Sequence, residues 1–95
     1  MNATEQRGKR ADVERCLHEL NPSALFMDGL DDAIIGPGAQ YTKHPLVVYS
    51  EVKIIKALMA QEMTHEEAVE WYFHNIACAY MGPDTPIIVH DEHDL

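Results

Sequence analysis

The spacing of apolar side chains changes along this chain, and the change predicts where helices and strands lie. Residues 10–20 carry apolar side chains at intervals of four and three, at Val13, Leu17 and Leu20. This spacing predicts a short helix, which Asn21-Pro22 ends because a residue before proline disfavours helical geometry. Residues 1–9 are polar, and we expect them to be flexible.

The next apolar segments are short and lie between turn-forming residues. Ser23 is expected to cap a single apolar turn over residues 24–27. Ala33-Ile34-Ile35 predicts a first strand, and Gly36-Pro37-Gly38 is expected to close it as a turn that cannot continue a ladder. Leu46-Val47-Val48-Tyr49 is the clearest strand, because β-branched and aromatic residues prefer strands.

Two helices with recognisable caps should follow. Ser50 is placed to cap the first, which we expect to reach about Glu62. Its predicted core residues are Val52, Ile55, Leu58 and Met59. Thr64 and Glu67 fit a capping box, in which each side chain accepts the other residue's amide hydrogen. The second helix is expected to end near Gly82-Pro83, with an apolar stripe of Val69, Tyr72, Phe73, Ile76 and Tyr80.

The remaining pattern completes a small α+β fold. Ile87-Ile88-Val89 predicts a last strand, and residues 90–95 an acidic mobile tail. The order α-β-β-α-α-β favours a three-stranded sheet with about three helices packed on one face, in one domain over residues 1–95. No apolar run approaches the ~18 residues of a membrane span. With no signal peptide, we expect a cytoplasmic protein whose cysteines, Cys16 and Cys78, stay reduced.

Negative charge is concentrated in the second half of the chain. Residues 57–95 contain eight carboxylates and no lysine or arginine, so they hold −8 of the formal net charge of −9. A field of one sign repels phosphate backbones and attracts basic surfaces. The basic residues near the N-terminus are offset by acids and have no aromatic residues among them. Direct binding of nucleic acid is therefore not expected.

The predicted third helix carries the candidate site. Glu66, Glu70 and His74 follow one another every four residues, with Glu67 alongside, on the face opposite the apolar stripe. Such a row could hold a divalent metal or serve acid–base chemistry, but a solvated face fits better. Trp71 lies outside the stripe among these acids. Because exposed tryptophan is enriched in binding hot spots, it indicates contact with a partner or a second subunit.

Other metal and catalytic patterns are weak. His74 and Cys78 have the spacing of a two-point helical clamp, and Cys16 with His18 could complete it only if the first and third helices packed together. His90 and His93 in the tail could bind metal loosely. Neither Ser23 nor Ser50 lies in a nucleophile motif, and Asp31-Asp32 fits a turn or cap better than an acid dyad. We expect no catalytic set, metal or cofactor.

Several phrases of the sequence resemble a family of small bacteriophage and prophage proteins. They are residues 28–36, 46–50, 63–70, 75–76 and 82–87, and the likeness spans residues 28–88, about two thirds of the chain. The N-terminal extension, up to Leu25, departs from it. The resemblance carries no known activity and no functional residues. It implies expression inside an infected bacterium, where small acidic phage proteins often bind and disable host machinery.

These observations lead to three hypotheses. The first is a non-catalytic binding protein whose acidic helix face, with Trp71, docks on a basic host protein or complex as a takeover or anti-defence inhibitor. Such a face could imitate a nucleic-acid backbone. The second is a homo-oligomer whose interface forms a small-ligand pocket, suggested by the surplus of large apolar residues. The third is a metal-dependent enzyme.

Overall fold

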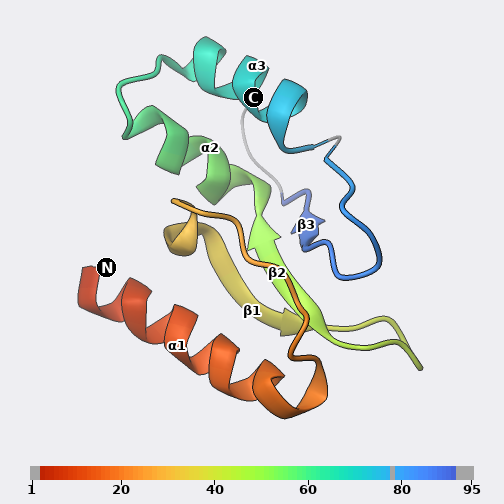
Figure 1. The fold of residues 1–95 in the computed structure, drawn as a ribbon. Coiled ribbons are helices and arrows are strands. Elements are labelled where there is room, and N and C mark those ends of the chain that lie inside the picture. The colour runs from red at the N-terminus through yellow and green to blue at the C-terminus, as the bar shows by residue number, and fades with distance from the viewer. Residues whose placement is uncertain (1–2, 78, 92–95) are drawn as a thin grey trace.

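The computed structural model describes residues 3–77 and 79–91, and the fold is of the α+β class with the predicted order of elements (Figure 1). This part of the chain forms three α-helices and one three-stranded sheet. The elements are α1 (Ala3–Leu20), β1 (Ile34–Gly38), β2 (Leu46–Ser50), α2 (Glu51–Met59), α3 (His65–Asn75) and β3 (Ile87–Val89). A 3-10 turn, Asp31–Ala33, precedes β1, as expected for Asp31-Asp32.

The first strand is longer than predicted. Gly36, Pro37 and Gly38 do not close β1 but pair in antiparallel register with Val48, Val47 and Leu46. Because β1 is an edge strand, the missing N–H of Pro37 does not interrupt the sheet. The register shifts between Ile34 and Gly36, which marks a bulge. The prediction that the Gly-Pro-Gly turn stops the ladder was therefore wrong.

The last strand pairs in parallel with the central strand. Val48, Tyr49 and Ser50 of β2 lie opposite Ile87, Ile88 and Val89 of β3, and α2 and α3 form the connection between the two strands. Parallel strands end at the same edge of a sheet. The residues that follow β2 and β3 in sequence are therefore neighbours in space.

One face of the sheet and the three helices share a single core. Val47 and Tyr49 of β2 are fully buried, whereas Ile35 on β1 is 45% exposed. α1 adds Val13 and Leu17 to this core. Leu20 was expected there too but is exposed, because α1 ends at that residue and Asn21 turns inward instead. The Asn21 amide donates to the Pro45 carbonyl (3.0 Å) and to the Asp84 carboxylate (3.1 Å).

The segment between α1 and the sheet is irregular rather than helical. The apolar turn expected over residues 24–27 does not form. Instead, the Met27 amide donates to the Tyr49 hydroxyl at 2.8 Å, and the Leu25 amide donates to the Asp84 carbonyl at 3.2 Å. Burial raises the pKa of Tyr49 above its ordinary value. Long-range partners thus satisfy amides that a local helix would have used.

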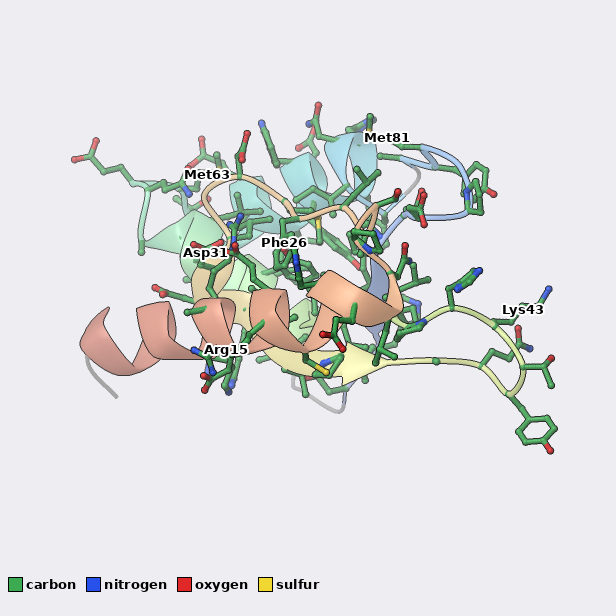
Figure 2. The ribbon with its side chains drawn as sticks, turned by 60° about the horizontal axis from the view of Figure 1, so that its bottom comes forward. Arg15, Phe26, Asp31, Lys43, Met63 and Met81 are labelled. Atoms are coloured by element: carbon green, nitrogen blue, oxygen red, sulfur yellow. The ribbon has the colours of Figure 1, made fainter. Side chains whose placement is uncertain are left out.

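α1 begins at Ala3, well before the predicted start at residue 10. Arg10 fixes it to the irregular segment: the guanidinium donates to Glu14 and Asp31, both at 2.7 Å, and lies 4.1 Å from the Phe26 ring centre. Figure 2 shows Phe26 and Asp31 on the side of α1 that faces the rest of the molecule. Within the described ranges, no helix combines the length and apolar character needed to cross a membrane.

Both predicted helix caps are confirmed. Ser50 accepts from the Lys53 amide, and Thr64 and Glu67 form the complete capping box. The predicted core faces were wrong in part. In α2 the buried apolar residues are Ile54, Ile55 and Leu58, and Met59 is 39% exposed.

α3 is both shorter than predicted and rotated. It ends at Asn75 rather than near Gly82, and its buried row is Ala68 and Tyr72, continued by Ile76. Phe73 and Tyr80, expected in the core, are 51% and 76% exposed. Tyr72 packs against α2, where its hydroxyl reaches Glu51, and with Tyr72 at its centre the buried row takes in Ala68 rather than Phe73.

Candidate binding surface on helix α3

The acidic face of α3 is exposed as predicted. Glu66, Glu67, Glu70 and His74 all have exposed side chains. The Glu67 carboxylate also serves the capping box, where it accepts from the Thr64 amide at 2.9 Å. These hydrogen bonds with Thr64 hold the pKa of Glu67 below its ordinary value. Glu67 is therefore held at the start of α3 as a carboxylate.

Four of the five predicted site residues meet around one depression. Glu67, Glu70, Trp71 and His74, with Asn75, line a shallow hollow of about 370 Å³, which we call the acidic hollow. Glu66 is exposed beside it but does not line it. Trp71 is 42% exposed, so solvent reaches a large part of its side chain.

A second, larger depression shares Trp71 and Asn75 with the acidic hollow. This apolar groove has a volume of about 540 Å³ and lies between α3, the irregular segment after α1, and β3. Its main apolar side chains are Phe26, Met27, Trp71, Ile76, Tyr80, Met81 and Ile88. Met81 and Tyr80 are 74% and 76% exposed. Figure 2 shows Met81 at the edge of the molecule, just beyond the end of α3.

Charged side chains are few among the described residues that line the groove. Among the described residues that line it, Asp28 is the only carboxylate, His90 is the only histidine, and there is no lysine or arginine. Glu67 and Glu70 lie on the other side of Trp71, in the acidic hollow. Trp71 therefore separates an apolar surface from an acidic one.

A buried carboxylate, Glu51, contacts two residues that line the groove, Tyr72 and His90. Glu51, the first residue of α2, is 6% exposed, and its Oε2 accepts from the Tyr72 hydroxyl at 2.7 Å. The same oxygen lies 2.8 Å from His90 Nδ1. Burial, and then the Glu51 carboxylate, raise the pKa of Tyr72 well above its ordinary value. The start of a helix also favours a negative charge, which suits Glu51.

The first two residues of the predicted mobile tail belong to this cluster. Asp91 accepts from the Val52 amide at 3.1 Å and from the Ser50 hydroxyl, so it caps α2 from the end of β3. His90 pairs with Glu51. These two residues of the predicted mobile tail thus make specific contacts with α2, and the rest of the tail, residues 92–95, lies outside the described residues.

The structure gives no metal site within the residues it describes, since no three histidine, cysteine or carboxylate side chains gather there. Cys78 and His93, two of the predicted candidate ligands, lie outside that part of the chain. Cys16 is an exposed thiol on α1. α1 packs against β1 and the 3-10 turn and lies away from α3 (Figure 1), so Cys16 and His18 do not join His74.

Sequence reasoning missed the groove and the Glu51 cluster. One signal in the sequence could have indicated the groove. Two large apolar residues, Tyr80 and Met81, lie at a predicted helix end, where they must be either buried in the core or part of an interaction site. Nothing in the sequence linked Glu51 to Tyr72 or His90, which are 21 and 39 residues away. No family model matches this chain, and neither the curated proteins nor the solved structures contain a match to it.

Proposed function

We propose that this chain is a non-catalytic binding protein, and that the acidic face of α3 docks on a basic partner with Trp71 as its central contact. The observation that carries the proposal is the position of Trp71, half-exposed between the acidic hollow and the apolar groove. Tryptophan in such a place supplies the large apolar contact typical of hot spots. The acids around it supply selectivity for positive charge.

Charge distribution supports the same assignment. Glu66 and Glu70 have no ion-pair partner among the described residues, whereas Arg10 and Arg15 on α1 are both paired. Unpaired acids on one face produce a negative field that attracts a basic surface and speeds its approach. The acidic face is therefore available to an external partner.

The partner class follows from the charge and from the resemblance to phage proteins. We propose a basic protein, or protein complex, of the bacterium in which the chain is expressed. Proteins that handle or defend against nucleic acid are the natural candidates, because their binding sites are built to accept rows of negative charge. The chain would act there as a takeover or anti-defence inhibitor.

The test is affinity capture from bacterial lysate, followed by kinetics with the purified partner. Replacing Glu66, Glu67 and Glu70 by Gln should leave thermal melting close to wild type, slow association and reduce its dependence on salt. Glu19→Gln on α1 is the matched control, since its carboxylate is exposed on another helix. Failure to capture any partner, or an affinity that ignores salt, would contradict the proposal.

A second candidate function is favoured by the size of the apolar groove. At about 540 Å³ it falls in the range of small-ligand pockets, and exposed apolar side chains on its rim could form a subunit interface. In that case the chain would be a homo-oligomer with a ligand between subunits. Light scattering separates the two candidate functions. A monomeric protein would rule out the homo-oligomer, and Trp71 would then be available to contact a different protein.

A further inference from the structure

We infer that the apolar groove receives an amphipathic helix of the partner, with apolar side chains facing the groove and lysine or arginine along the edge that passes Trp71. This inference rests on the proposed function, because it names the segment through which the basic partner is recognised. A helix binds in such a groove through apolar anchor side chains that lie about one helical turn apart on one of its faces.

The lining of the groove suits large apolar anchors. Aromatic and methionine side chains dominate its exposed part, with Tyr80 and Met81 on the rim and Trp71 on the wall. Methionine is unbranched and polarizable, so it adapts to anchors of different shape. Exposed apolar side chains gathered around one groove mark an interaction site.

A helix fits better than an extended strand along the walls formed by the irregular segment and Met81, because three amides there already have partners. The amides of Leu25 and Met27 donate to Asp84 and Tyr49. On the opposite wall, the Met81 amide donates to the Thr85 hydroxyl at 2.7 Å. An added strand needs main-chain hydrogen bonds from its host, whereas a helix satisfies its own backbone.

The negative charge beside the groove determines which edge of the bound helix should carry lysine or arginine. Glu67 and Glu70 lie directly beyond Trp71, and Asp28 lies in the groove itself. No lysine or arginine is found among the described lining residues. A second copy of this chain is disfavoured, because each copy has a formal charge of −9 and would bring like charges together.

The chain contains a built-in reporter for the test. Trp71 is the single tryptophan, so its fluorescence reports on the groove in the full-length protein. The probe is a synthetic leucine–lysine peptide of about fourteen residues, roughly four helical turns, with its leucines on one face. A peptide of the same composition in scrambled order, and a leucine–glutamate version of the first, are the controls.

The expected result is a saturable shift of Trp71 emission to shorter wavelength with the amphipathic leucine–lysine peptide. The scrambled peptide should bind about tenfold more weakly, because it has the same charge but no continuous apolar face. The leucine–glutamate peptide should not bind. Equal binding of the amphipathic and scrambled lysine peptides would reduce the effect to charge alone and overturn the inference.

Variants separate the groove from the acidic hollow. Tyr80→Ser with Met81→Ser removes two exposed apolar side chains and should weaken peptide binding about tenfold without changing its salt dependence. Tyr41→Ser is the matched control, since Tyr41 is 92% exposed in the β1–β2 connection. Figure 2 shows Lys43 of that connection far from Met81. Glu67→Gln with Glu70→Gln should instead reduce the salt dependence.

The outcomes distinguish this inference from the proposed function. If the glutamine variants weaken the natural partner while the Tyr80/Met81 variant binds it normally, the proposed function stands and the groove assignment fails. A dimer in light scattering that the Tyr80/Met81 variant breaks would show a second copy in the groove. An apolar dye that binds there and is not displaced by the amphipathic peptide would show a small-molecule pocket. Any of these three results would overturn the inference that the groove receives a helix of the partner.

Discussion

Helices α1 and α3 use the same kinds of residue in opposite ways. On α1 the apolar residues Val13 and Leu17 are buried, and Arg10 is neutralised by Glu14 and Asp31. On α3 only one row enters the core, while large aromatic side chains on both sides of it stay exposed. α1 therefore buries two of its three predicted apolar residues and pairs Arg10 and Arg15, with Leu20 exposed only at its end, whereas α3 leaves large aromatic side chains and unpaired acids exposed along its length.

The sharpest test of this contrast compares neighbours on α3. Tyr72→Ala should cost about 3–5 kcal/mol of unfolding free energy, because the ring is fully buried and its loss leaves a cavity. Trp71→Ala should cost about 1 kcal/mol, since part of that ring is already in water and alanine favours a helix. Urea denaturation measures both. Equal losses would make Trp71 a core residue and remove the contrast.

The same Trp71→Ala variant should have its larger effect on binding. Loss of a central aromatic contact raises the dissociation rate, whereas loss of steering charges slows association. Surface plasmon resonance with the captured partner reads the two rates separately. Phe73→Ala is the matched control, because Phe73 is 51% exposed on the other side of the buried row. An unchanged dissociation rate for Trp71→Ala would place the contact elsewhere.

The buried cluster beneath the groove gives the next effect. Glu51→Ala removes the acceptor of the Tyr72 hydroxyl and the partner of His90, so it should cost about 1–3 kcal/mol. Tyr72→Phe keeps the ring and removes only the hydroxyl, and should cost less. Thermal melting of both variants tests this order. If Tyr72→Phe proved as costly as Glu51→Ala, the hydroxyl alone would account for the cluster.

Stability should also fall in alkali. The folded-state pKa values of Tyr72 and Tyr49 are raised above the ordinary tyrosine value of 10.0. The folded protein therefore holds both protons more tightly than the unfolded chain. The resulting stability is fully present below pH 10 and is lost as pH rises above it. Tyr72→Phe should flatten this loss in pH-dependent denaturation, and an unchanged slope would contradict the assignment.

The smallest expected effect concerns single surface charges. Arg15→Gln on α1 and Glu70→Gln on α3 should each change unfolding free energy by no more than about 0.5 kcal/mol. Arg15 is paired with Asp12 at 2.9 Å, but both side chains are largely exposed. Only Glu70→Gln should slow association with the partner. A loss of binding with Arg15→Gln would move the contact to α1.

Local signals in the sequence were enough for the order of the helices and strands and for the caps of α2 and α3, but not for the element bounds or for the turn expected over residues 24–27. Ser50 and Thr64 were found because a cap depends on residues within one helical turn. The element order followed from changes in apolar spacing, and the exposed acids of α3 followed from its periodicity. Pro37 shows what local signals cannot predict. A proline ends a strand only where its missing N–H is needed by a neighbouring strand, and Pro37 remains within β1 because β1 lies at the edge of the sheet.

The sequence by itself determined the class of fold, the charge of the α3 face and the unusual position of Trp71, because each depends on residue type and local spacing. Only the tertiary structure decided that Glu51, Tyr72 and His90 meet, since the packing of α2 against α3 brings Tyr72 to Glu51 and the parallel pairing of β2 with β3 brings His90 there. It also decided that the groove exists. A groove is the space between elements, and no single element encodes it.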